Sequence, residues 1–162
     1  MGPVTMRRSP TIFLQTVIVL IGIGALALML WEPHLEGRNV HASPFQIYFN
    51  DPFLACAYLA SIPFFVALYQ AFMLLGHIGR NKVFSLDSVR ALRIIKYCAI
   101  SLVAFLLAAE AYFFIVVRGH DDIAGGVAIS LFLILVSAVA AAAASVLETT
   151  LQNTFDIGPK TT

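Results

Sequence analysis

Four long apolar segments constrain the fold of this chain more than any other feature. They cover residues 12–31, 53–75, 97–117 and 125–147. A helix needs about 20 residues to cross a hydrocarbon core of about 30 Å. A backbone in lipid must satisfy its own hydrogen bonds, and these segments lack the alternation of barrel strands. The sequence therefore predicts an all-α fold, an integral membrane bundle of four transmembrane helices.

The composition supports the same class of protein. Of the 162 residues, 60% are hydrophobic and 12% are charged, whereas a soluble domain has about 25% charged residues. A chain this short cannot hide so much apolar surface in one core. We therefore expect a single membrane domain over residues 1–162, with a lipid bilayer as its solvent. The net charge of +1 is too small to indicate direct binding of nucleic acid.

The first apolar segment could also belong to a cleaved signal peptide, because Arg7 and Arg8 precede it and Ala25-Leu26-Ala27 resembles a cleavage site. That triplet, however, lies inside the segment, which is longer than the 7–15 residues, roughly, of a signal core. We expect this helix to be retained.

The placement of Lys and Arg predicts the orientation in the membrane. Eight of the ten basic residues fall in the N-terminal tail, the loop between the second and third segments, and the C-terminal tail. Short loops rich in Lys and Arg stay in the cytoplasm. We therefore expect both termini to be cytoplasmic, in a multi-pass protein of the bacterial cytoplasmic (inner) membrane. The C-terminal tail from about residue 152 to 162 is predicted to be disordered.

The middle loop contains a predicted amphipathic helix at about residues 85–96, which continues into the third segment and extends it into the cytoplasm. Ser85 is its predicted N-cap, and Asp87 lies in the first turn, where the helix dipole favours an anion. Apolar residues share one face, and three cations recur on another: Arg90, Arg93 and Lys96. Such a segment suits an anionic leaflet. The three cations are candidate lipid- or partner-binding residues, although a basic cap that stops translocation explains them as well.

Glu110 is the only formally charged residue inside the four segments. An isolated carboxylate at that depth is costly, so we expect it to face the bundle, to pair or to be neutral. Its candidate partners are Tyr58, Ser61 and Ser130. A stripe of small residues on the third segment lies roughly opposite, so this helix should be buried on both faces or Glu110 should be protonated. The carboxyl is either a functional relay or ligand anchor, or a hydrogen-bonded group that fixes the register of the helices.

Small residues at helical spacing predict close packing of the third and fourth helices, because small side chains let helices approach in lipid. They are Ser101, Ala104, Ala108 and Ala111 on the third helix, and Ser137, Ala141 and Ser145 on the fourth.

The stretch R-G-H-D-D-I-A-G-G, which begins at Arg118, is the predicted outer turn between these two helices. Asp121 or Asp122 can cap the first amides of the fourth helix. Arg118, Asp121 and Asp122 are candidate functional residues beside Glu110, although the capping explanation requires no ligand.

Motifs of known enzymes and cofactor sites do not occur in the sequence. It lacks a P-loop, G-x-S-x-G and H-E-x-x-H. Haem in a membrane bundle requires axial histidines inside the helices, whereas His34, His41, His77 and His120 lie at or beyond helix ends. We expect no enzyme activity, no cofactor and no metal.

The order of features resembles the DUF2975 family of bacterial membrane proteins. The resemblance covers most of the chain and lies in these stretches: E-P-H-L-E-G-R-N-V from Glu32, I-Y-F-N-D-P-F from Ile47, S-I-P-F-F-V-A-L-Y-Q from Ser61, N-K-V-F-S-L-D-S-V-R-A-L-R-I-I-K-Y from Asn81, and the turn from Arg118. The pattern F-S-x-x-S-V-x-x-L-R is the most specific part. The resemblance implies a four-helix membrane protein without an assigned reaction. Some members are encoded beside a small Cro/C1-type DNA-binding regulator, which implies a partner of that kind.

Two functional hypotheses follow. The first is a non-enzymatic accessory or regulatory membrane protein that presents its basic loop to a cytoplasmic partner or to anionic lipid. The second is a small transporter or channel subunit that uses Glu110. The second requires a homo-oligomer, since four helices with one deep carboxyl make a poor pore alone.

Overall fold

The computed structural model describes residues 8–35, 52–80, 82–112, 114–115 and 124–157, and within these ranges it contains four long helices and no strand. The helices are α1 (Arg8–Leu35), α3 (Pro52–Gly79), α4 (Leu86–Tyr112) and α5 (Ala124–Ile157). Each is long and apolar enough to cross a membrane. The predicted all-α fold with four transmembrane helices is confirmed.

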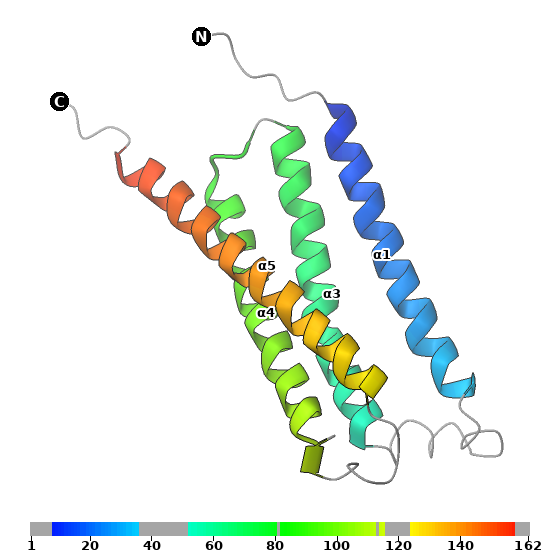
Figure 1. Ribbon diagram of the computed structural model, residues 1–162. Coiled ribbons are helices and arrows are strands. Elements are labelled where there is room, and N and C mark those ends of the chain that lie inside the picture. The colour runs from blue at the N-terminus through cyan, green and yellow to red at the C-terminus, as the bar shows by residue number, and fades with distance from the viewer. Residues whose placement is uncertain (1–7, 36–51, 81, 113, 116–123, 158–162) are drawn as a thin grey trace.

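Successive helices run in opposite directions. The first turn of α1, the connection from α3 to α4 and the last turn of α5 therefore lie at one end of the molecule (Figure 1). The sequence predicts this grouping from the distribution of Lys and Arg. That this end faces the cytoplasm stays a prediction.

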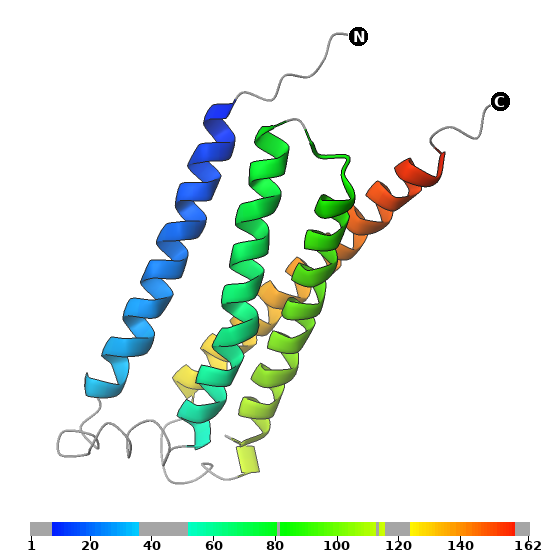
Figure 2. The same cartoon turned by 180° about the vertical axis from the view of Figure 1, so that it is seen from behind.

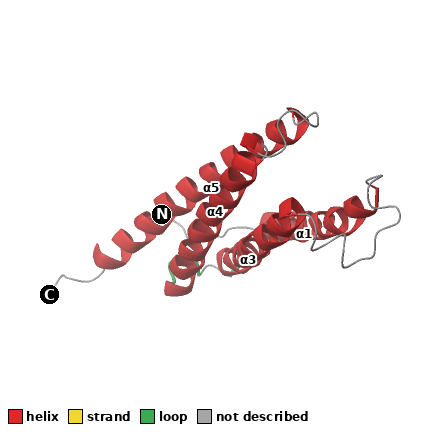
Figure 3. Cartoon of the chain, turned by 90° about the horizontal axis from the view of Figure 1, so that it is seen from below, coloured by secondary structure: helices red, strands yellow, loops and turns green. Residues whose placement is uncertain are grey.

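The helices follow one another in a row in chain order. The extensive contacts join α1 to α3, α3 to α4, and α4 to α5. The view from behind shows α3 beside α4 (Figure 2), and the end-on view shows α1 at one side of the row and α5 at the other (Figure 3). The outer face of α1 consists largely of exposed Ile, Leu and Phe side chains, as expected for a helix in lipid.

Small and polar residues join α1 to α3. Gln15 Nε2 donates a hydrogen bond to the carbonyl oxygen of Phe72 over 3.1 Å, and the Tyr58 hydroxyl donates to the carbonyl oxygen of Met29 over 2.8 Å. A Cβ atom at Gly79 would lie 3.1 Å from Cγ2 of Thr11. The absence of a side chain at Gly79 therefore permits the close approach of the two helices.

The buried core of the described residues lies between the start of α4 and the end of α5. It consists of Val89, Leu92, Ala144 and Leu151, with Leu74, Val83 and Ile95 packed against it. Val89 and Leu92 of the predicted amphipathic segment thus pack against α5, which continues past Leu147, whereas Leu86 on the same face is 75% exposed. That this segment lies at an anionic leaflet stays a prediction.

The start of α4 agrees with the sequence. Ser85 Oγ accepts a hydrogen bond from the backbone amide of Ser88 over 3.2 Å, so Ser85 is the N-cap. The Ser88 side chain is fully buried and contacts both Ser85 Oγ and the carbonyl oxygen of Lys82. From Leu86 the helix continues without interruption to Tyr112.

The prediction of a disordered tail from about residue 152 is wrong for residues 152–157, which complete α5. Leu151 anchors this end in the core, and the hydroxyl groups of Thr149, Thr150 and Thr154 donate to carbonyl oxygens one turn earlier. Such bonds satisfy the hydroxyl groups but do not stabilise the helix, so the packing of Leu151 in the core explains why α5 continues beyond the apolar segment.

The two predicted stripes of small residues differ in burial. On α5, Ser137, Ala141 and Ser145 are partly buried and adjoin buried Ala144, whereas on α4 the whole stripe from Ser101 to Ala111 is exposed. The prediction that this α4 stripe packs is wrong, because α4 instead turns Ala109 and Glu110 inward. The α4 helix is therefore not buried on both faces.

Candidate functional site

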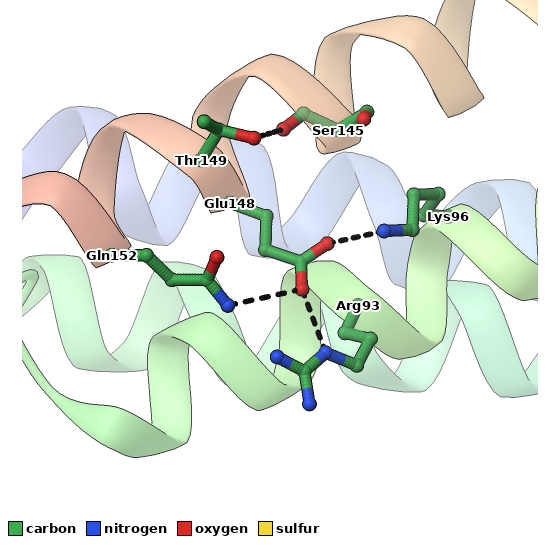
Figure 4. A network of polar contacts seen from close by, with 6 residues as sticks. All are labelled: Arg93, Lys96, Ser145, Glu148, Thr149 and Gln152. Carbon is green, nitrogen blue, oxygen red and sulfur yellow. Dashed lines mark hydrogen bonds and ion pairs between the residues drawn. The ribbon is translucent and has the colours of Figure 1, made fainter.

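A buried carboxylate joins the start of α4 to the end of α5. Glu148 on α5 is 5% exposed. Its Oε1 lies 2.7 Å from Arg93 Nε and its Oε2 lies 2.6 Å from Lys96 Nζ, and Gln152 Nε2 donates to Oε1 over 3.4 Å (Figure 4). Both oxygens of the carboxylate therefore accept charge-assisted or neutral hydrogen bonds, which is the condition for a buried charge to be tolerated.

The sequence does not reveal Glu148, because the fourth apolar segment ends at the residue before it. The expected hairpin of the third and fourth helices could have predicted its position, since residues that face each other across a hairpin lie equally far in sequence from the turn. Glu110 and Ser130 are 20 residues apart, and Arg93 and Glu148 are 55 residues apart. Both pairs are centred near residue 120, in the predicted turn. A hairpin centred there places an acid at 148 opposite the basic residues of α4.

This pairing reduces the number of unpaired cations on the predicted basic surface of Arg90, Arg93 and Lys96. Two of its three cations, Arg93 and Lys96, are engaged by Glu148, and only Arg90 has no hydrogen bond or ion pair among the described residues. Two cations and one carboxylate still leave a net positive charge, to which Arg90 adds. Arg93 donates to the carboxylate through Nε, and neither terminal nitrogen of its guanidinium group is joined to it by a hydrogen bond (Figure 4).

An open pocket of about 470 Å³ adjoins this cluster. We call it the basic groove, and its lining residues are Leu86, Val89, Arg90, Arg93, Gln152 and Phe155. The first four come from the first two turns of α4, and the last two come from the end of α5. The groove combines two guanidinium groups with an amide and three apolar side chains. This arrangement can hold an anionic group that carries an apolar extension.

A second buried carboxyl lies at the other end of α4. Glu110 is 7% exposed, as is Ser130 on α5. The Ser130 hydroxyl contacts Glu110 Oε1 and also lies 3.2 Å from the carbonyl oxygen of Val127. Glu110 Oε2 is buried without a hydrogen-bond partner among the described residues. The expectation that Glu110 faces the bundle is confirmed.

Of the three partners predicted for Glu110, only Ser130 contacts it within the described residues. The Tyr58 hydroxyl donates to Met29, and the Ser61 hydroxyl donates to the carbonyl oxygen of Tyr58. Arg118, Asp121 and Asp122 lie outside the described residues.

The two sites are far apart. Glu110 follows Arg93 by 17 positions of one helix, a distance of about 25 Å at a rise of about 1.5 Å per residue. The candidate residues therefore form a basic groove at one end of the hairpin and a carboxyl–hydroxyl pair at the other.

Comparison with known proteins agrees with this architecture. The family model described as "Protein of unknown function (DUF2975)" matches residues 37–158. The chain belongs to the DUF2975 family. The resemblance predicted from the sequence motifs is thereby confirmed, and the DUF2975 match includes every residue of the basic groove and of the Glu110–Ser130 pair.

A relative in Bacillus subtilis (strain 168) has the name "Uncharacterized membrane protein YoaS". It is 40% identical over 153 residues, which cover 94% of this chain and 95% of the relative. No solved structure matches this DUF2975 chain significantly. The relative and the four apolar helices together make this a multi-pass membrane protein.

Proposed function

We propose that this protein is a non-enzymatic accessory or regulatory membrane protein, and that the basic groove is the surface through which it engages an anionic partner. One observation carries the proposal, the pocket at the ends of α4 and α5 that is lined by Arg90 and Arg93. The excess of Lys and Arg at this end supports a cytoplasmic position for it, in a bacterial inner membrane with both termini inside.

The chemistry of the groove favours the phosphate headgroup of an anionic phospholipid as its occupant. Guanidinium groups recognise phosphate through paired donors. Beside them, Leu86 is 75% exposed and Phe155 is 37% exposed, and these side chains suit the adjoining acyl chain. Basic pockets between transmembrane helices on the cytoplasmic side bind such headgroups.

The test compares the full-length protein in lipid nanodiscs that contain either only phosphatidylcholine or added phosphatidylglycerol. Anionic lipid should raise the unfolding temperature of the wild type, and Arg90→Gln should remove most of that increase. Arg80→Gln is the matched control, since Arg80 is an exposed cation of the same end but does not line the groove. An equal loss in both variants would mean that general charge attraction explains the effect, and the proposal of a built site would fail.

A Cro/C1-type regulator is the competing occupant, and the same nanodiscs distinguish it. A purified Cro/C1-type regulator of the kind encoded beside some family members should bind no better to the wild type than to Arg90→Gln when phosphatidylcholine is the only lipid. If it binds the wild type there and Arg90→Gln abolishes that binding, the groove is a protein-binding surface and the lipid proposal is wrong.

A second candidate, a small transporter or channel subunit, is favoured by the buried Glu110–Ser130 pair, because intramembrane carboxyls are often parts of ion or proton pathways. This candidate requires a homo-oligomer that completes the pathway. Proteoliposomes should then show ion flux that Glu110→Gln reduces at least tenfold. Flux that is the same for the wild type and Glu110→Gln would rule it out.

A further inference from the structure

Glu148 contacts the lining of the basic groove without being part of it. It is 5% exposed, yet its Oε1 contacts one groove residue from each helix. Arg93 Nε on α4 lies 2.7 Å from this oxygen, and Gln152 Nε2 on α5 lies 3.4 Å from it (Figure 4). A single buried oxygen therefore connects lining residues of both helices.

The contact with Glu148 restricts Arg93 without using all of its donors. A guanidinium group is planar and carries N–H donors along more than one edge. Arg93 donates to the carboxylate through Nε, and its two terminal nitrogens make no hydrogen bond to another described residue. The edge between these nitrogens holds two parallel N–H groups, which suit two oxygens of one phosphate group. Glu148 thus leaves a phosphate-binding edge of Arg93 available.

The two arginines of the groove differ in how firmly they are held. The Arg93 side chain is 52% exposed, and an exposed arginine without a partner samples many rotamers, which a bound ligand must then restrict. Glu148 imposes an orientation on Arg93 before a ligand binds. Arg90, one turn earlier, has no hydrogen bond or ion pair among the described residues. Arg90 therefore loses more conformational freedom when it binds a ligand.

The negative charge of Glu148 does not cancel the positive charge of Arg93, because a second cation balances it. Lys96 Nζ lies 2.6 Å from Oε2, the other oxygen of the carboxylate, and Lys96 does not line the groove. The cluster of Arg93, Lys96 and Glu148 keeps a net positive charge, and Arg93 is its only member that lines the groove. The charge of Arg93 thus stays available to an anion.

We propose that Glu148 is a positioning residue for the basic groove, which holds Arg93 through Nε so that its terminal nitrogens bind the phosphate group of an anionic phospholipid. This inference rests on the proposed function of the groove and assigns the orientation of one of its two arginines. Glu148 itself does not contact the lipid. Charge alone predicts the opposite effect, because a carboxylate repels a nearby anion. The sign of the effect of Glu148 on binding therefore decides between the two explanations.

Native mass spectrometry of the full-length protein in mixed micelles, over a titration with phosphatidylglycerol, measures the binding. Glu148→Met removes the charge and both acceptor oxygens at nearly constant side-chain size. It should weaken binding about fivefold, as expected when one side chain must be immobilised by the ligand. Glu148→Gln keeps an oxygen that can accept from Arg93 Nε and should retain most of the affinity. Unchanged or tighter binding in Glu148→Met, or an equal loss in both variants, would overturn the proposal.

A second background separates positioning from a general loss of structure. In Arg93→Gln the guanidinium group is absent, so adding Glu148→Met should cause no further weakening of phosphatidylglycerol binding. A merely structural role of Glu148 would weaken binding equally in the wild-type and Arg93→Gln backgrounds, and that result would contradict the proposal.

Replacement of arginine by lysine tests the same orientation with Glu148 in place, and so does not depend on the folding of Glu148→Met. A lysine keeps the charge, but its single nitrogen cannot contact the carboxylate and also present paired donors to a phosphate. Arg93→Lys should therefore weaken binding more than Arg90→Lys, the matched change at the arginine that is not held. Equal effects would refute the positioning role. Failure of the proposed function gives a different result, in which the wild type binds phosphatidylglycerol no better than phosphatidylcholine.

Discussion

Lys96 Nζ on α4 lies 2.6 Å from Oε2 of Glu148 on α5. The lysine side chain is 21% exposed and the glutamate side chain 6% exposed, so this contact is shielded from water better than an ordinary surface ion pair. It lies beside the core formed by Val89, Leu92, Ala144 and Leu151. The carboxylate therefore fixes the end of α5 across the start of α4, the two segments that line the basic groove.

Replacing Lys96 should destabilise the α4–α5 hairpin more than replacing Arg93 or Arg90. Lys96→Gln loses a charge-assisted hydrogen bond to a buried carboxylate, a change that costs about 1.5–3 kcal/mol. Arg93→Gln should cost less, because the Arg93 side chain is 52% exposed and water screens its charge. Arg90→Gln is the control, since Arg90 does not contact Glu148. Denaturant unfolding in mixed micelles measures the order, and an equal effect of Arg90→Gln and Lys96→Gln would contradict it.

The interface between α4 and α5 should reject a larger side chain at Ala144, which is 4% exposed. Ala144→Leu inserts methylene groups into a filled core and should lower the free energy of unfolding by about 1–3 kcal/mol. Ala143→Leu is the matched control, since Ala143 is exposed on the same helix and should change stability little. Thermal unfolding of the two variants in the same detergent checks the difference. If Ala144→Leu and Ala143→Leu unfold at the same temperature, this end of α5 does not pack as described.

The contact between α1 and α3 depends on the missing side chain of Gly79. Replacing a helical glycine by alanine ordinarily favours the helix by about 1 kcal/mol, and Gly24→Ala should follow this rule because nothing lies within 4 Å of the added Cβ. Gly79→Ala should lose the advantage, since its Cβ would lie 3.1 Å from Thr11 Cγ2. Combining Gly79→Ala with Thr11→Ser, which removes Cγ2, should restore it. Stability measurements in which Thr11→Ser has no such effect would refute the explanation.

Ser85 should control the first turn of α4 and thereby the groove. Ser85→Ala removes the side-chain acceptor of the Ser88 amide, which also donates to the Ser85 carbonyl oxygen over 3.0 Å, and should destabilise the helix start by about 1 kcal/mol. Ser85→Asp retains an acceptor and should keep most of the stability. Hydrogen exchange of the amides from Ser88 to Arg90 reports this directly, with faster exchange expected in Ser85→Ala. Unchanged exchange there would mean that the backbone bonds to the Ser85 carbonyl oxygen and packing on α5 hold this turn without the side chain.

The sequence by itself determined the number of helices, their alternating direction and the N-cap at Ser85. These features depend on local properties, namely apolar length, the placement of cations and the chemistry of one side chain at a helix start. The sequence also identified Glu110 and named Ser130 among its partners, because a lone carboxyl in an apolar segment requires a polar neighbour.

Only the tertiary structure decided which faces meet. The sequence contains a stripe of small residues on both α4 and α5, yet the α4 stripe is exposed. Which face of a helix is buried depends on its rotation about its own axis, and that rotation depends on all its neighbours at once. The pairing of Glu148 with Arg93 and Lys96 depends on how far α5 continues past its apolar segment and on the register of the hairpin. The same three cations form a free basic surface when the sequence is considered alone. In the folded chain Arg93 and Lys96 form an ion-paired joint beside the groove, because a carboxylate 52 residues after Lys96 lies against them, and Arg90 lines the groove without contacting that carboxylate.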